Sequence, residues 1–480
     1  MSERGELRKA LSPMQVLSLA LGCIIGFGCF VLPGDFLGKS GPLGTVIGIL
    51  VGAGLMLLII KSYGMVVEQF PVAGAEYAHA YFAAGRYHAF VCGWFLALGY
   101  LAIIPLNATA LALLGKFVAP SLFARGYLYT VAGYDVFFGE ILLASTAIVV
   151  VAWFNLRSVH SVGDFQKILT FVLVGTALFV GVGIFFFGGA SPENLQPWFA
   201  PDKTTLGSIL AIVAVAPWLF VGFDTLPQAA EELAFSESQT KRLMVISVVA
   251  GALLYVIVTL ATAVVRPWPA MLADHPAWMT GAAVQSSLGT FGLAVLVVAI
   301  VAAIFTGING FFLASSRLMF SMARARVLPA FFSRIRVDRG TPAGAVLFAA
   351  GLALVAPWFG RQALVWIVDM SALGTAFGYG YTCLAAYFLA RQTSTRVYAI
   401  LGTVASAGFV VLLTVPGMPG FMATPSWVAL AGWVLLGGIF FATQADAYRA
   451  IENKELDGLI LGPRGVANLE SRERFTPANL

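Results

Sequence analysis

Two glycine-containing interruptions of long apolar runs are the features of this chain that could do chemistry. The first is G-C-I-I-G-F-G at 22–28, and the second is P-W-L-F-V-G-F-D at 217–224. Glycine weakens a helix inside a membrane and leaves backbone N–H and carbonyl groups that need other partners. The N-terminus of a half-helix offers N–H groups to an anion, whereas unwound carbonyls suit an ammonium group or a cation. A zwitterion satisfies both ends, so the pair indicates a binding site for one.

A single glycine cluster is most simply a packing surface between helices. Two clusters in corresponding places, five predicted helices apart, are instead typical of a transporter built from inverted repeats, with its site at the middle of the membrane. The acid that closes the second cluster, Asp224, strengthens this interpretation.

Ionisable residues within apolar runs are the second signal, because a charge in the membrane is costly unless it is paired or hydrated. Asp224 has two interpretations, a coupling role and a structural hydrogen bond to freed backbone. Asp369 is most simply placed at the outer end of its span. Lys61 is expected near the cytoplasmic interface, where it can snorkel, and a proton-carrier role is the less favoured alternative.

The amino-acid composition is that of an integral membrane protein. Of 480 residues, 59% are hydrophobic and only 11% are charged, against about 25% charged in soluble domains. The 51 glycines suit helices that pack closely in lipid. The net charge of +5 is no sign of nucleic-acid binding, since basic residues in such a chain report orientation.

Several chemistries are excluded by the motifs. No phosphate-binding G-x-x-x-x-G-K-[ST] loop occurs, which argues against ATP-driven transport, and no nucleophile–base pair indicates an enzyme. The histidines have no metal-ligand spacing, and the cysteines lie in apolar segments: His79, His88, His160 and His275; Cys23, Cys29, Cys92 and Cys383. We therefore expect no cofactor, no metal and no disulfide-linked accessory subunit.

Twelve transmembrane helices are predicted by the apolar runs that carry these residues. They lie near 13–37, 43–69, 88–114, 138–155, 166–188, 206–233, 242–265, 288–314, 343–358, 363–390, 397–415 and 427–444. Lys and Arg gather in alternate connections, above all in the stretch 317–339, which places both termini in the cytoplasm.

The predicted organisation has one large membrane domain. Residues 1–12 form a cytoplasmic segment and 13–444 the transporter domain. The two repeats cover about 13–188 and 206–390, and two extra helices cover about 397–444. Residues 445–480 are expected as a polar cytoplasmic tail with at most one amphipathic turn.

Four motifs give the chain a resemblance to the amino acid–polyamine–organocation (APC) family of transporters. They are I-I-G-F-G-C-F-V-L-P-G at 24–34, S-Y-G-M-V-V-E-Q-F-P-V-A-G-A-E-Y at 62–77, V-G-F-D-T-L-P-Q-A-A-E-E at 221–232 and S-S-R-L-M-F-S-M-A-R-A-R-V-L-P at 315–329. Each alone is weak, but the four occur in the family's order, and the resemblance runs from about 11 to 444.

The resemblance implies an all-α integral membrane fold of the LeuT type: a five-plus-five inverted repeat, broken in its first and sixth helices, with two added helices. It implies that backbone at 26–28 receives a carboxylate, that Trp218 closes over substrate, and that Asp224 serves gating or coupling. The substrate-binding residues expected on this basis are Ile25, Gly26, Phe27, Gly28, Gly99, Tyr100, Trp218, Phe220, Gly222, Phe311 and Ser371.

Departures from the family pattern bear on substrate and coupling. Phe27 replaces a small residue, so it either narrows the site or points away from it. Met65 stands where an acid is common, and Leu173 stands where several proton-coupled members have lysine. Ala325-Arg326 replaces the usual Asp-Gly.

These observations predict a secondary transporter of the cell membrane that moves an amino acid or small amine by alternating access, through proton symport or exchange. Sodium coupling remains open, because Thr306 and Asn309 could serve a cation site or simply join helices. The alternatives are a polyamine exchanger with Asp224 as ligand, and a sensor that binds without flux. The expected partners are the substrate and the bilayer, with no nucleic acid, and the protein is expected as a monomer or homodimer.

Overall fold

Helices make up most of the computed structural model, which describes residues 11–131, 134–157, 159–274, 278–336, 341–360 and 362–475. Within these ranges, nine helical segments are long and apolar enough to cross a membrane. They are Pro13–Val31 (α1 and α2 together), α3 (Pro33–Gln69), α5 (Arg86–Val118), α7 (Phe138–Asn155), Gly163–Phe187 within α8 (Val159–Phe187), α12 (Glu237–Ala263), α14 (Met279–Arg324), α17 (Thr393–Thr414) and α18 (Thr424–Ala450). The chain is therefore a multi-pass α-helical membrane protein, as predicted.

The other three predicted spans are helical too. The range 343–358 holds α15 (Ala343–Ala353) and η4 (Ala356–Phe359), and 363–390 corresponds to α16 (Gln362–Leu389). The range 206–233 holds a series of short helices: α9 (Thr205–Val213), α10 (Ala216–Leu219), α11 (Thr225–Gln228) and η2 (Ala230–Glu232). The relation between two five-helix repeats stays a prediction.

Both predicted helix interruptions are present. The first break, Gly26–Phe27, separates α1 (Pro13–Ile25) from α2 (Gly28–Val31), and Gly26 has φ of 44°. The second break, Phe220–Asp224, separates α10 from α11, and Gly222 has φ of 135°. Left-handed φ values of this kind are readily adopted only by glycine, which is why the helices stop here.

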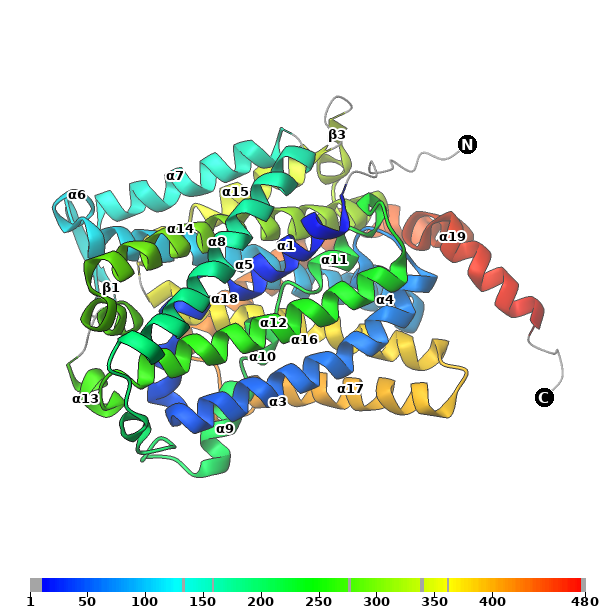
Figure 1. Ribbon diagram of the computed structural model, residues 1–480. Helices are drawn as coiled ribbons and strands as arrows, with labels where there is room; N and C mark the ends of the chain where they lie inside the picture. Colours follow the sequence, from blue (N-terminus) through cyan, green and yellow to red (C-terminus); the bar gives the residue numbers. More distant parts are fainter. Residues whose placement is uncertain are drawn as a thin grey trace.

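The broken helices lie inside the bundle. α1 packs against α8, α12 and α14, while α10 packs against α3 and α16. α5 joins the two groups by packing against both α14 and α16. Figure 1 shows α1, α10 and α11 surrounded by the longer helices, so the breaks are shielded from lipid.

The two ends of the bundle differ. One end, called here the hairpin end, carries α6 (Pro120–Phe123), the antiparallel pair β1 (Tyr127–Val131) and β2 (Tyr134–Phe137), η1 (Pro192–Leu195) and α13 (Trp268–Ala273). The other, the α4 end, carries α4 (Ala75–Ala84), η3 (Ala330–Ser333), β3 (Ile335–Arg336), β4 (Thr341–Pro342) and α19 (Asn453–Phe475). In Figure 1, α1 begins and α19 lies at this same α4 end.

The C-terminal tail differs from its prediction. α18 continues to Ala450, and α19 is a long helix with a kink at Gly462 rather than a single amphipathic turn. Polar residues outnumber apolar ones in 453–475, so the sequence shows no long apolar run there. Leu456, Ile460 and Leu461 are fully buried against the bundle, and this packing stabilises the helix.

Two helices start much earlier than predicted. α3 and α14 begin before the predicted starts at 43 and 288, because each includes a first segment that ends in a glycine of positive φ. These glycines are Gly41, with φ of 69°, and Gly289, with φ of 65°.

Candidate functional site

The second break contacts the last turns of α1 directly. A Cβ atom built on Gly222 would lie 2.7 Å from Cys23 Cβ and 3.0 Å from the Ala20 carbonyl oxygen. No other residue could therefore occupy position 222 without separating α1 from the second break. The second break therefore lies against the helical segment that ends at the first break.

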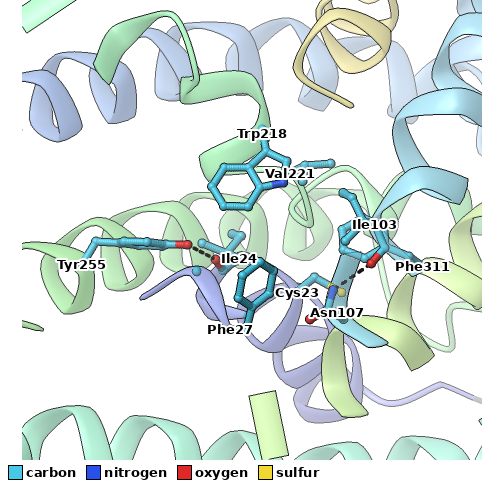
Figure 2. A pocket seen from close by; sticks show the side chains of 11 residues that line it. Cys23, Ile24, Phe27, Ile103, Asn107, Trp218, Val221, Tyr255 and Phe311 are labelled. Carbon is cyan, nitrogen blue, oxygen red and sulfur yellow. Dashed lines mark hydrogen bonds between the residues drawn. The ribbon is translucent and has the colours of Figure 1, made fainter. Parts of the chain in front are cut away.

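A small cavity lies beside this contact (Figure 2). Its volume is about 20 Å³, close to what one water molecule needs. It is lined by Cys23, Ile24, Gly26, Phe27, Gly28, Ile103, Asn107, Trp218, Val221, Tyr255 and Phe311. The cavity is smaller than any amino acid, so binding one requires the lining side chains to move apart. The structure thus shows a closed site.

Trp218 covers the cavity. Its indole meets the Phe27 ring edge-on, with 6.4 Å between ring centroids, and Figure 2 shows the indole next to Phe27. A Cβ atom on Gly28 would lie 2.8 Å from Trp218 Cη2 and 2.9 Å from the Tyr255 hydroxyl oxygen. Trp218 therefore rests directly on the start of α2, and the Phe27 side chain lies inside the site and narrows it.

Both kinds of polar partner are available to a zwitterion. Gly28 occupies the first position of α2, where backbone N–H groups have no preceding helical carbonyl. Asn107 donates from Nδ2 to the Ile103 carbonyl at 2.9 Å, while its Oδ1 is buried and has no partner among the described residues. The site therefore offers donors to a carboxylate and an acceptor to an ammonium group.

Tyr255 holds the end of α1 in place. Its hydroxyl donates to the carbonyls of Ile24 and Ile25, at 3.2 and 3.3 Å. These carbonyls are at the C-terminal end of α1, where helical partners are missing. A hydroxyl from α12 thus satisfies backbone acceptors that the first break exposes.

Asp224 supports the second break from behind the cavity. Its carboxylate is fully buried and accepts hydrogen bonds from the Gly222 N–H at 2.8 Å, the Tyr100 hydroxyl at 2.9 Å and the Tyr379 hydroxyl at 3.4 Å. Asp224 therefore has the structural role that one interpretation assigned to it. It is not among the residues that line the cavity.

The predicted site residues fall into two groups. Gly26, Phe27, Gly28, Trp218 and Phe311 line the cavity. The others surround it: Ile25 accepts from Tyr255, Tyr100 lies 6.0 Å from the Phe311 ring, Phe220 packs near Gly52, Gly222 packs on α1, and Ser371 donates to the Gly99 carbonyl at 2.8 Å. The last pair joins α16 to α5 and lies outside the cavity lining.

The other polar candidates lie away from the cavity. Thr306 donates to the carbonyls of Ala303 and Gly22, and Asn309 joins Gln166 to Asn155, so these groups connect helices. Lys61 lies on the Tyr398 ring at 3.7 Å, and Asp369 accepts from Ser426 at 3.3 Å. His275 is outside the described residues, as is the side chain of His160.

Six cavity residues were not predicted: Cys23, Ile24, Ile103, Asn107, Val221 and Tyr255. Tyr255 carried a usable signal, since a tyrosine in the middle of an apolar span needs a buried hydrogen-bond partner. Asn107 lies two residues after Pro105 in an apolar run, a pattern that indicates a local helix kink rather than a binding residue. The four apolar residues carried no signal that separates them from ordinary core.

Comparisons with known proteins agree with this architecture. The chain matches the family model described as amino acid permease over residues 11–440. It is 24% identical to the amino-acid permease RocC of Bacillus subtilis (strain 168) over 82% of each chain. It is 26% identical to the branched-chain amino acid permease BcaP of that organism, over 71% of this chain and 73% of the permease.

The methylthioribose transporter of the same organism is 24% identical over 92% of this chain and 94% of that protein. The matched family region includes both breaks, the cavity and nearly every membrane helix. The resemblance to APC transporters is thereby confirmed, and the chain belongs to the amino acid permease family.

Proposed function

We propose that this protein moves an amino acid or related small amine across the cell membrane by alternating access. The observation that carries the proposal is the closed cavity between two helix breaks, covered by Trp218 and supplied with both free N–H groups and a buried acceptor. Membership of a permease family supports transport as the use of such a site.

In the proposed binding mode, the substrate carboxylate lies at the start of α2, near Gly28. Its amine faces Asn107 Oδ1 and the carbonyls of the second break. Trp218 then closes over the substrate as it lies over Phe27 in this structure. Because Phe27 occupies part of the space, the site favours small substrates.

The polyamine alternative has less support. None of the cavity-lining residues carries a charged side chain, and Asp224 already accepts three hydrogen bonds behind the cavity. A cationic chain without a carboxylate would leave the N–H groups of α2 without an anion. A neutral solute is the better second candidate, favoured by the similarity to a methylthioribose transporter over most of the chain.

Orientation and gating complete the proposal. The α4 end faces the cytoplasm, since the basic residues gather in the segments that meet there. At that end Arg317 is fully buried and paired with Glu232, and Arg324 pairs with Glu231. These pairs hold η2 against α14, so they must separate when the site opens to the cytoplasm. Transport is driven by a proton gradient or by exchange.

The test is uptake of a radiolabelled panel into proteoliposomes, with and without an inward proton gradient and with internally loaded substrate. The panel contains amino acids, amines and methylthioribose. Saturable amino acid uptake that falls severalfold in Trp218→Ala and Gly26→Leu supports the site. Unchanged uptake in both variants rejects it, and binding without any flux identifies a sensor instead.

A further inference from the structure

A second buried acid lies near Asp224. Glu76, in α4, is fully buried, and its carboxylate accepts hydrogen bonds from the Tyr63 hydroxyl at 2.8 Å and from Gln228 Nε2. No Lys, Arg or His forms an ion pair with it within the described ranges. A buried carboxylate without a cation is costly, so such a group is retained only where something offsets the cost.

Gln228 links Glu76 to α11, the short helix that follows the second break. It is the last residue of α11, four positions after Asp224, which precedes that helix. A second route connects Glu76 to Asp224 through two tyrosines. The Tyr63 ring meets the Tyr379 ring edge-on at 6.1 Å, and the Tyr379 hydroxyl donates a hydrogen bond to Asp224. A change at Glu76 therefore reaches both the second break and the half-helix that follows it.

Titratable groups face Glu76 from every element around it. They are Tyr63 on α3, Cys92 and Tyr100 on α5, Tyr379 on α16, Asp224 before α11, and His79 on its own helix. α4 lies outside the membrane-spanning helices. Burial, with the nearby Asp224 carboxylate, raises the pKa of Glu76, whereas burial lowers the pKa of His79 to about 3. None of these neighbours supplies a positive charge at neutral pH.

We propose that Glu76 is the residue that binds and releases the coupled proton, and that Gln228 transmits its charge state to α11. This inference rests on the proposed function, of which it specifies the coupling group. The proton adds to a Glu76 carboxyl oxygen from water on one side of the membrane and returns to water on the other.

The geometry explains how protonation would move α11. Hydrogen bonds to a carboxylate are roughly twice as strong as those between neutral groups, so ionised Glu76 holds Gln228 firmly. Protonation removes that charge. It also turns the carboxyl group into a donor, whose O–H then faces another donor, the Nε2 group of Gln228. Gln228 Oε1 is buried and has no partner among the described residues, so it can accept this O–H once the amide turns. The contact between α4 and α11 is thereby rearranged.

The first test compares gradient-driven uptake with exchange in proteoliposomes. Wild-type uptake should rise severalfold with an inward proton gradient. Glu76→Gln should lose this stimulation while exchange against internal substrate remains measurable, and Glu76→Asp should retain it. Glu140→Gln is the matched control, because Glu140 is an equally buried carboxylate, on α7, paired with Lys116 at 2.6 Å. Stimulation by the proton gradient that persists in Glu76→Gln overturns the inference. Wild-type transport that does not respond to the gradient also overturns it, but leaves the proposed function intact.

The second test needs no substrate. An acid whose pKa is raised by folding stabilises the protein at low pH, and this contribution is lost as the pH rises through the folded-state pKa. Because folding raises the pKa of Glu76 from 4.5 to about 8, the wild-type melting temperature should fall between about pH 5 and about pH 8, and the fall should be smaller in Glu76→Gln. An identical pH dependence in the two proteins overturns proton binding at Glu76, whether or not any solute is transported.

Discussion

Gly28 determines how closely Trp218 approaches the first break. It lies in helical backbone at the start of α2 and is not among the residues of positive φ, so alanine would be tolerated by the main chain. What forbids a side chain is space, since Trp218 and the Tyr255 hydroxyl both lie within 3 Å of where a Cβ would be. The closed position of the tryptophan depends on this missing methyl group.

Gly28→Ala should therefore hinder closure. Overpacking of this kind costs about 1–3 kcal/mol, which corresponds to a loss of about 5- to 150-fold in apparent affinity. The measurement is concentration-dependent uptake into proteoliposomes. Gly54→Ala is the control, because nothing lies within 4 Å of a Cβ at that position of α3. Equal uptake by the two variants would show that Trp218 does not need to rest on α2.

Asp224→Asn tests the structural role of the acid. All three of its observed partners are donors, and an asparagine brings an NH₂ group of its own toward them. We expect a loss of about 1–3 kcal/mol of stability, measured as a lower melting temperature, with amino acid and amine uptake affected alike. Asp369→Asn should be milder, because this carboxylate is only partly buried, with hydrogen bonds from Ser426 and from the Ala423 backbone. A selective loss of amine uptake would instead make Asp224 a ligand.

The predicted site residues that line the cavity are mainly those that adjoin a break. Gly26, Phe27, Gly28 and Trp218 were identifiable because interruption of an apolar run is visible in one sequence. Tyr255 reaches the cavity from another helix, so its place depends on packing that a single sequence does not display. Gly99 and Ser371 show the converse. They lie on the expected helices, but these helices are oriented so that the two residues bond to each other and do not line the cavity.

At the scale of elements, two ion pairs hold η2 against the end of α14. Arg317 and Glu232 are both fully buried and bidentate, with distances of 2.6 and 3.1 Å. The backbone N–H of Leu11 also donates to the Glu232 carbonyl oxygen, so the residues just before α1 meet the same point. The segment after the second break is thus fixed to its surroundings by charge as well as by packing.

Arg317→Ala should be strongly destabilising, by about 3–5 kcal/mol, because it leaves a buried carboxylate without its partner. Arg326→Ala is the matched comparison on the same stretch. That arginine pairs with Glu455 at 2.8 Å, but both side chains are nearly half exposed, so the loss should stay below about 1 kcal/mol. Thermal unfolding in detergent measures both. Similar losses would mean that the pair at Arg317 is well hydrated.

The membrane helices were predictable because long apolar runs have few other solutions, and the predicted range 138–155 coincides with α7. The elements that were missed depend on weaker signals. Polar residues predominate in α19, and β1 with β2 occupies a loop whose residues alternate too briefly for a sequence pattern. Apolar content determines where the chain crosses the membrane, whereas the structure of the polar segments depends on their tertiary contacts with the rest of the protein.

At the scale of the whole molecule, α19 connects helices that are far apart in sequence. Asn468 donates to the Gln69 carbonyl at the end of α3, and Asp457 accepts from Tyr81 on α4 at 2.8 Å. Arg464 pairs with Glu237 on α12, and Glu455 pairs with Arg326 after α14. Figure 1 shows α19 lying across this end of the bundle. Any opening here must change the contacts of α19.

A chain that ends at Glu452 should therefore open more readily at the α4 end. It loses the buried Leu456, Ile460 and Leu461, worth about 1.5–3 kcal/mol each, so its melting temperature should fall by several degrees. Opening is read from thiol labelling of Cys92, which is buried beside Glu76, in a background where the other three cysteines are alanine. Faster labelling is expected in the truncated chain than in one that ends at Phe475 and keeps all of α19. If Cys92 is labelled at the same rate in the two chains while only the chain that ends at Glu452 has a lower melting temperature, α19 contributes stability alone. In that case the ion pairs of Arg317 and Arg324 suffice to keep the α4 end closed.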